Sequence, residues 1–334
     1  MQVDWLLLVI IALALVFDFL NGMNDSGNIV ATMISTGALA PRRALLLASV
    51  CEFVGPFVFG VAVAATIGSG IVDPMAVGPL PVLAAVLAGI AWNVVTLRLG
   101  VPSSSSHALV GGLVGSALAT RGPEAINLEG LSVVVAALVF SPVLGFVLGN
   151  IAMRSILRLT KNATPRINTH FRQGQIATSA ALALGHGTND AQKTMGIITL
   201  ALVAFGSLSE FRVPFWVVAA SALAIALGVG LGGWRIIRTL GGKIYRIRPV
   251  HGFSAQATSA AVILGAALLG GPVSTAQVVG SSIIGVGSAE RLSKVRWGVA
   301  GNILLAWMVT IPASAAIGGF LSLALEWLTT IGVV

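Results

Sequence analysis

Charged side chains are scarce in this sequence. Asp, Glu, Lys and Arg make up 9% of its 334 residues, whereas hydrophobic residues make up 56%, and the mean hydropathy is +0.97. A water-soluble chain carries about 25% charged residues, so this composition excludes a soluble globular protein. Apolar stretches of roughly 17–25 residues recur along the chain, which is the length that a helix needs to cross a bilayer. We predict an all-α polytopic membrane protein.

Cysteine is almost absent as well, and a single residue, Cys51, excludes an intramolecular disulfide. The net charge is +8, but the basic residues gather between the apolar stretches. The two largest groups are Arg154, Arg158, Lys161, Arg166, Arg172 and Arg235, Arg238, Lys243, Arg246, Arg248. Such clusters are typical of cytoplasmic loops. We therefore expect a lipid bilayer, and no nucleic acid, around this chain, with the basic loops inside the cell and both termini outside.

The same order of motifs occurs twice. "GMNDSGN" at 22–28 matches "GTNDAQK" at 187–193, and "PSSSSH" at 102–107 matches "PVSTAQ" at 272–277. The offsets, 165 and 170 residues, indicate one duplicated unit. Because the basic loops fix the sidedness, the first unit begins outside and the second inside, which predicts two inverted-topology repeats. Residues 1–153 would form the first membrane repeat, 154–173 a short basic cytoplasmic linker, and 174–334 the second, inverted membrane repeat.

The Pro of each later motif and the hydroxyl residues after it suit the start of a helix. Pro removes no helical hydrogen bond there, and Ser or Thr caps free N–H groups. A capped helix start would explain one copy, but two copies at inverted positions would aim two positive helix ends at one cavity. We expect re-entrant hairpins near Pro102 and Pro272. Their tips would surround a tetrahedral oxyanion with the hydroxyls of Ser104, Ser105, Ser106, Ser274 and Thr275.

The two Asn-Asp pairs place carboxylates at membrane depth. An ionised group there costs at least about 2.5 kcal/mol, so it usually serves function rather than packing. We expect broken helices at both pairs, because glycines such as Gly22 and Gly187 flank them. Unwound carbonyls and carboxylate and amide oxygens are ligands for Na⁺ or another hard cation. The cation ligands would include Asn24, Asp25, Asn189 and Asp190, with Na⁺ at the two aspartates.

Charge balance also predicts a coupling cation. Asp25, Asp190 and an oxyanion would place at least three negative charges in one low-dielectric cavity, where repulsion far exceeds that in water. Lys193 follows Asp190 by three residues on the same helix face and would balance one charge. The remainder requires Na⁺, or alternatively H⁺, entering with the anion. An anion channel would not need paired carboxylates in its path, and no evident metal cluster or nucleophile–base pair indicates an enzyme.

The four motifs resemble those of the inorganic phosphate transporter (PiT) family, which carries G-x-N-D-x-x-N/K in both halves and P-x-S-T-T-H and P-V-S-T-T-Q between its later helices. The likeness covers nearly the whole chain. It implies a bacterial phosphate or sulfate permease of the cytoplasmic membrane, with no cofactor, that couples phosphate import to Na⁺ or H⁺ by alternating access. It further implies that the hydroxyl tips hold phosphate together with Asn24, Thr188 and Asn189, and that Gln277 belongs to the cation ligands.

The chain departs from the family pattern at the hydroxyl tips. Ser105 and Ser106 stand where Thr is usual, and Ala276 replaces a hydroxyl residue. An anion site with fewer donors or a different size would result, so a sulfate symporter is the alternative function, with an anion channel less favoured. The sequence leaves open whether the chain forms a homo-oligomer.

Overall fold

Helices account for almost all of the residues that the computed structural model describes, 5–331. The first half contains α1 (Trp5–Ser35), α2 (Pro41–Phe59), α3 (Ala62–Gly70), α4 (Pro74–Val77), α5 (Pro79–Leu99), α6 (Ser105–Arg121) and α7 (Leu128–Leu159). The second half contains α8 (Ile167–Ala204), α9 (Phe215–Leu231), α10 (Trp234–Arg238), α11 (Pro249–Leu268), α12 (Thr275–Glu290) and α13 (Trp297–Thr330). A π-helical turn, η2 (Thr239–Lys243), follows α10.

Several helices have the length and apolar composition of membrane spans. Among the described residues these are α1, α5, α7 and α13, and the bent pairs α2–α3 and α9–α10 each provide enough length for one more. The two pairs bend by 79° and 58° at breaks of a few residues. The all-α membrane class is therefore confirmed. The longest helix, α8, falls outside this set because its middle carries the polar stretch around the second Asn-Asp pair.

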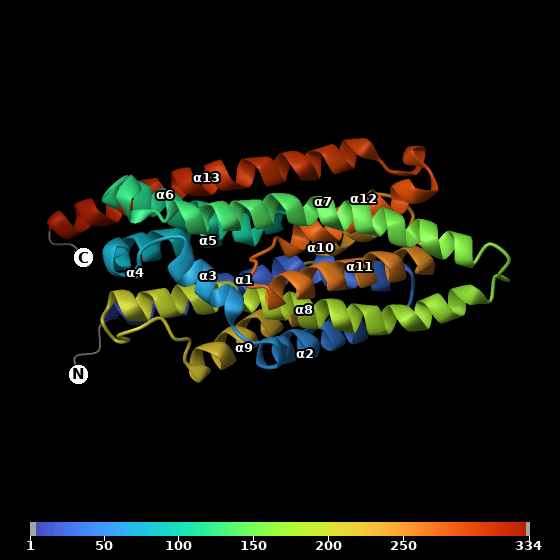
Figure 1. The fold of residues 1–334 in the computed structure, drawn as a ribbon, viewed down its shortest axis with the longest axis horizontal. Coiled ribbons are helices and arrows are strands. Elements are labelled where there is room, and N and C mark those ends of the chain that lie inside the picture. Colours follow the sequence, from blue (N-terminus) through green and yellow to red (C-terminus); the bar gives the residue numbers. More distant parts are fainter. Residues whose placement is uncertain (1–4, 332–334) are drawn as a thin grey trace.

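Two helical hairpins enter the molecule from opposite ends. Both chain termini lie at one end, and the α7–α8 connection lies at the other (Figure 1). The α5–α6 hairpin occupies the half near the termini, whereas α11–α12 occupies the half near the α7–α8 connection (Figure 1). Their tips meet, because Ser106 Oγ donates to the Val273 carbonyl over 3.1 Å and Gln277 Nε2 lies 3.4 Å from His107 Nδ1. This arrangement brings the N-termini of α6 and α12 together, as the sequence predicts.

Corresponding helices of the two halves make corresponding contacts. Helix α1 packs against α9, and α8 packs against α2. In the same way α6 packs against α13, and α12 packs against α7. Each half therefore contributes elements to the other half's packing, and α1 and α8, which carry the Asn-Asp pairs, run side by side in contact at the centre.

Glycines allow the closest of these contacts. At the α1–α9 interface, a Cβ on Gly22 would clash with the Ile225 carbonyl oxygen, and a Cβ on Gly228 would clash with the Phe19 carbonyl oxygen. Backbone atoms cannot move aside as flexible side chains do. Only glycine therefore permits α1 and α9 to lie at this separation.

The α8–α2 interface repeats this arrangement. A Cβ on Gly187 would clash with the Glu52 backbone, and a Cβ on Gly55 would clash with the Leu184 carbonyl oxygen. Gly187 and Gly22 occupy the same place in the two Asn-Asp motifs. The motif glycines therefore serve close helix packing in both halves.

The prediction that the helices are broken at the Asn-Asp pairs is wrong. Helices α1 and α8 are continuous through both motifs, without interruption between Trp5 and Ser35 or between Ile167 and Ala204. The breaks lie instead between α2 and α3 and between α9 and α10. A glycine in a helix weakens it by only about 1 kcal/mol relative to alanine, and tight packing against a neighbouring backbone offsets that cost.

We expect the Gly228→Val substitution to lower the midpoint of thermal unfolding of the purified chain. The added side chain would force α9 away from the Phe19 carbonyl, and overpacking of this kind costs about 1–3 kcal/mol. The matched control is Gly301→Val, because a Cβ at Gly301 has no heavy atom within 4 Å. Equal midpoints for the two variants would show that close α1–α9 packing contributes nothing to stability.

Candidate ion-binding site

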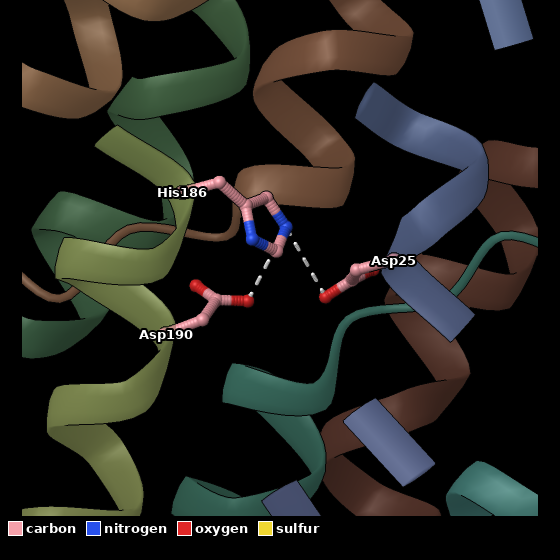
Figure 2. Close-up of side chains that lie close together, drawn as sticks. All are labelled: Asp25, His186 and Asp190. Carbon is pink, nitrogen blue, oxygen red and sulfur yellow. Dashed lines mark ion pairs between the residues drawn. The ribbon is translucent and has the colours of Figure 1, made fainter. Parts of the chain in front are cut away.

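Asp25 and Asp190 face each other across a histidine. Asp25 comes from α1, whereas His186 and Asp190 lie one turn apart on α8 (Figure 2). His186 Nε2 is 3.6 Å from Asp25 Oδ2 and also 3.6 Å from Asp190 Oδ2. All three side chains are buried. One potential ligand atom from each lies within 4.8 Å of the others, so the three residues could hold a cation together.

Glu52 of α2 completes the histidine's surroundings. Its Oε1 lies 2.8 Å from His186 Nδ1, whereas the two aspartates approach Nε2. Glu52 is fully buried, at 0% exposure. The imidazole therefore bridges three carboxylates from three helices, and its two nitrogens both face acidic oxygens.

Asp190 receives donors from three elements. Lys193 Nζ lies 2.5 Å from Asp190 Oδ1, and Lys193 is itself fully buried. Asn21 Nδ2 donates to Asp190 Oδ2 over 3.3 Å, and Thr275 Oγ1 donates to the same oxygen over 3.0 Å. The charge of Asp190 is thus largely satisfied by the protein, and Thr275 connects it directly to the tip of the α11–α12 hairpin.

Asp25 is less well satisfied. Asn28 Nδ2 donates to Asp25 Oδ1 over 2.6 Å, whereas Asp25 Oδ2 accepts no hydrogen bond from a described residue. Asn28 stands at the position that corresponds to Lys193 in the second motif. The first motif therefore offers a neutral amide where the second offers an ammonium group.

The amide groups of both motifs present free oxygens. Asn24 Nδ2 donates to the Asn93 carbonyl over 3.2 Å, and Asn189 Nδ2 donates to the Gly271 carbonyl over 3.1 Å. The Oδ1 atoms of both residues are buried and have no hydrogen-bond partner among the described residues. Buried polar atoms nearly always have a partner. Amide oxygens oriented in this way suit a hard cation.

Four of the five predicted hydroxyls are already engaged. Ser104 caps α6 by accepting from the His107 backbone N–H over 3.1 Å, and Ser274 caps α12 by accepting from the Gln277 N–H over 3.4 Å. Ser106 donates to Val273, and Thr275 donates to Asp190. These hydroxyls therefore hold the two tips in place as well as lining them.

Ser105 differs from the other tip residues. Its side chain is buried, and its hydroxyl makes no hydrogen bond within residues 5–331. It is also the first residue of α6, where backbone N–H groups lack helical acceptors. Ser105 thus offers a free donor at the point where the two hairpins meet.

Two predicted site residues lie elsewhere. Thr188 Oγ1 donates to the Leu184 carbonyl over 2.7 Å and faces Gly55 at the α8–α2 interface. Gln277 lies beside His107, between the hairpins, and contacts neither aspartate through a hydrogen bond. The structure therefore brings Asn24, Asp25, Asn189, Asp190, Lys193 and Thr275 into one buried region and leaves Thr188 at its edge.

The predicted site leaves out four residues that lie against the two aspartates or their histidine, namely His186, Glu52, Asn21 and Asn28. A signal for three of them exists, because residues three or four apart share a helix face. His186 precedes Asp190 by four residues, Asn21 precedes Asp25 by four, and Asn28 follows Asp25 by three. The expectation of unwound segments hid this spacing. Glu52 has no such signal, since it comes from another helix.

Comparison with known proteins identifies the family. The sequence pattern of the Phosphate transporter family matches residues 21–318. A probable low-affinity inorganic phosphate transporter of Bacillus subtilis (strain 168) is 47% identical over 317 residues, 94% of this chain and 95% of the relative. Its counterpart in Rhizobium meliloti (strain 1021) is 48% identical over 314 residues, 93% of this chain and 94% of the relative.

A solved structure has the same fold. The structure described as the sodium-dependent phosphate transporter superimposes with a TM-score of 0.87 at 25% identity, covering 97% of this chain and 100% of that one. The family pattern spans both Asn-Asp motifs and both hairpin tips, so the match includes every element of the site. The chain belongs to the Phosphate transporter family.

Proposed function

We propose that this chain is a symporter that imports inorganic phosphate across the cytoplasmic membrane together with Na⁺. The observation that carries the proposal is the hydrogen bond from Thr275 Oγ1 to Asp190 Oδ2. It joins a hairpin tip suited to an anion to a carboxylate cluster suited to a cation. A cation bound by the aspartates and an anion bound at the tips would therefore share one residue.

The buried charges support cation coupling. Asp18, Asp25, Glu52 and Asp190 are all at most 2% exposed, and the basic side chains buried among them are Lys193 and His186. Four carboxylates exceed the positive charge that these two residues can supply. A phosphate anion at the neighbouring tips would add to that excess. In a low-dielectric interior, this excess of negative charge requires co-bound cations.

The ligand atoms favour Na⁺ as the coupling ion. Asp25 Oδ2 and the Oδ1 atoms of Asn24 and Asn189 are hard oxygen ligands without donors. The similar solved structure is described as sodium-dependent, and the relatives named above are described as transporters of inorganic phosphate. These names favour phosphate over sulfate and Na⁺ over H⁺ for this chain, and they support a transporter rather than an enzyme.

Proton coupling is the second candidate, because of His186. An imidazolium bridging Glu52, Asp25 and Asp190 would itself act as a cation within the cluster. A proton delivered to this ring would then replace Na⁺ in balancing phosphate. The two candidates differ in which gradient drives uptake.

The paired helix contacts support alternating access by inverted repeats. Each half packs through α1–α9 or α8–α2 onto the other, and the two hairpins enter from opposite ends. Rocking of one half against the other would open the tips to one side and then the other. The basic residues around the α7–α8 connection support a cytoplasmic location for that end and a location outside the cell for both termini.

Uptake into proteoliposomes tests the proposal. We expect labelled phosphate to accumulate under an inward Na⁺ gradient, weakly under an inward H⁺ gradient, and labelled sulfate to enter much more slowly. Accumulation driven by an H⁺ gradient alone would favour proton coupling, the second candidate, over Na⁺ coupling. Phosphate entry that ignores both gradients would contradict symport.

We expect Asp25→Asn to reduce Na⁺ dependence more than Asp190→Asn. Asp25 has one amide donor and a free oxygen, whereas Asp190 already has Lys193. Asparagine retains the shape and one oxygen but removes the charge. Because each ligand strengthens the binding of the other by the same factor, phosphate affinity at fixed Na⁺ should fall along with Na⁺ affinity. Titration of Na⁺ against phosphate binding measures both. An unchanged Na⁺ response in both variants would remove these carboxylates from the mechanism.

We expect Ser105→Ala to weaken phosphate affinity by about tenfold or more. The substitution removes one donor, and a hydrogen bond to a charged acceptor contributes about 1.5–3 kcal/mol. Ser116→Ala is the matched control on the same helix, since the Ser116 hydroxyl bonds only to Leu113 within α6. Equal phosphate affinity in the two variants would place the anion away from the α6 start.

Thr275→Val tests the connection between the two ions. Valine retains the branched shape but cannot bond Asp190, so both phosphate affinity and Na⁺ dependence should fall, and Thr275→Ser should restore them. Equilibrium binding of phosphate at several Na⁺ concentrations separates the two effects. A variant that loses phosphate affinity while its Na⁺ response stays intact would show that the hydrogen bond does not couple the ions.

A further inference from the structure

A cavity of about 370 Å³ lies at the end of the molecule where α1 ends and α11 and α13 begin. This is the end that carries the α7–α8 connection (Figure 1). The cavity is separate from the central cluster, and its lining includes three arginines, Arg246, Arg248 and Arg296. Its volume falls within the usual range for small-molecule sites, roughly 300–1,000 Å³.

The arginines are incompletely neutralised. Arg248 forms an ion pair with Glu290, whose other oxygen pairs with Lys294. Arg296 donates over 3.4 Å to the Lys243 carbonyl, and Arg246 has no ion pair with any described residue. One carboxylate thus serves several cations. All three arginines are exposed, so water screens part of their mutual repulsion, and an anion bound between them would relieve the rest.

Neutral groups around the cavity add to this preference. Ser35 and Thr36 at the end of α1 also line the cavity, where their hydroxyls already donate to the Thr32 carbonyl and to Gln175 Oε1. Gly241 and Gly242 of the π-helical turn expose backbone there, and such turns occur frequently at functional sites. Pro249 begins the 20-residue helix α11 at the cavity, so the positive end of that helix dipole also faces it.

Membrane topology alone does not explain this arrangement. The positive-inside tendency requires basic residues on one side of the bilayer, but it does not require them to line one cavity with hydroxyls and backbone groups. Guanidinium groups match phosphate oxygens through paired hydrogen bonds. We propose that this cavity binds a phosphate-bearing anion of two or more charges, independently of the transport site. Its source would be either a soluble phosphoanhydride or the headgroup of an anionic lipid.

Calorimetric binding of tripolyphosphate to the full chain in phosphatidylcholine nanodiscs tests the proposal. We expect Arg246→Gln/Arg296→Gln to weaken binding by about tenfold or more, because each arginine contributes charged hydrogen bonds. The matched control is Arg166→Gln/Arg172→Gln, which removes the same charge from positions around the start of α8 that are exposed, as Arg246 and Arg296 are, but that do not line the cavity. The control should bind within about twofold of wild type. Citrate, a non-phosphate anion, should bind more weakly than tripolyphosphate.

Two further measurements identify the source of the anion. In nanodiscs that contain phosphatidylglycerol, tripolyphosphate binding that persists indicates a soluble ligand. If phosphatidylglycerol blocks tripolyphosphate binding and is retained by wild type but not by the Arg246→Gln/Arg296→Gln variant, the bound anion is a lipid headgroup. Both results support a phosphate site. Equal loss of binding in the two double variants, equal binding of citrate, or no binding of either phosphate compound would overturn it.

Folding and transport are checked separately. Arg246→Lys/Arg296→Lys should restore part of the binding, because lysine keeps the charge without the paired geometry. Na⁺-driven uptake of orthophosphate should persist in the glutamine variant, which shows that the chain is folded. If that uptake were absent from wild type while tripolyphosphate binding still required the two arginines, the proposed function would fail and this site would stand.

Discussion

The structure depends on keeping several carboxylates buried without leaving their charge unbalanced. Asp25, Glu52 and Asp190 come from three helices and meet around a single imidazole. In water such a group would be screened, but in a membrane interior each uncompensated charge costs several kcal/mol. The chain supplies Lys193 and His186 as basic groups and several neutral donors, whereas Asp25 Oδ2 accepts no hydrogen bond from a described residue. That remaining deficit of positive charge is the basis of the proposal that a cation enters together with the anion.

The balance requires precise distances between helices, and glycine provides them. Gly22 and Gly187 let α1 and α8 approach the backbones of α9 and α2, which brings Glu52 within reach of His186. Continuous helices then place residues three and four apart on the same face. Unwound segments would free more carbonyls but would scatter these side chains. The helices stay intact because tight packing against neighbouring backbones offsets the cost of their glycines.

The sequence alone predicts much of this, since the relevant signals are local. Apolar length predicts the spans, and proline followed by serine predicts the starts of α6 and α12. Contacts between distant segments cannot be predicted from such local signals. Nothing local reveals that Glu52 reaches His186, because that depends on the register of α2 against α8. The engaged hydroxyls are equally hidden, since a serine after proline can cap its helix, as Ser104 does, or bond across to another hairpin, as Ser106 does.

Each half of the chain contacts the other at the centre, and one difference between the halves gives the two aspartates unequal neighbours. Asn21 and His186 hold the same place in the two motifs, 165 residues apart. Asn21 bonds Asp190 of the other half, while His186 faces Asp25 of the other half. At the next matching place the second half has Lys193 and the first has Asn28, a fixed cation against a neutral amide. Asp190 therefore has a fixed ammonium group beside it, whereas Asp25 has a neutral amide and shares the His186 ring with two other carboxylates.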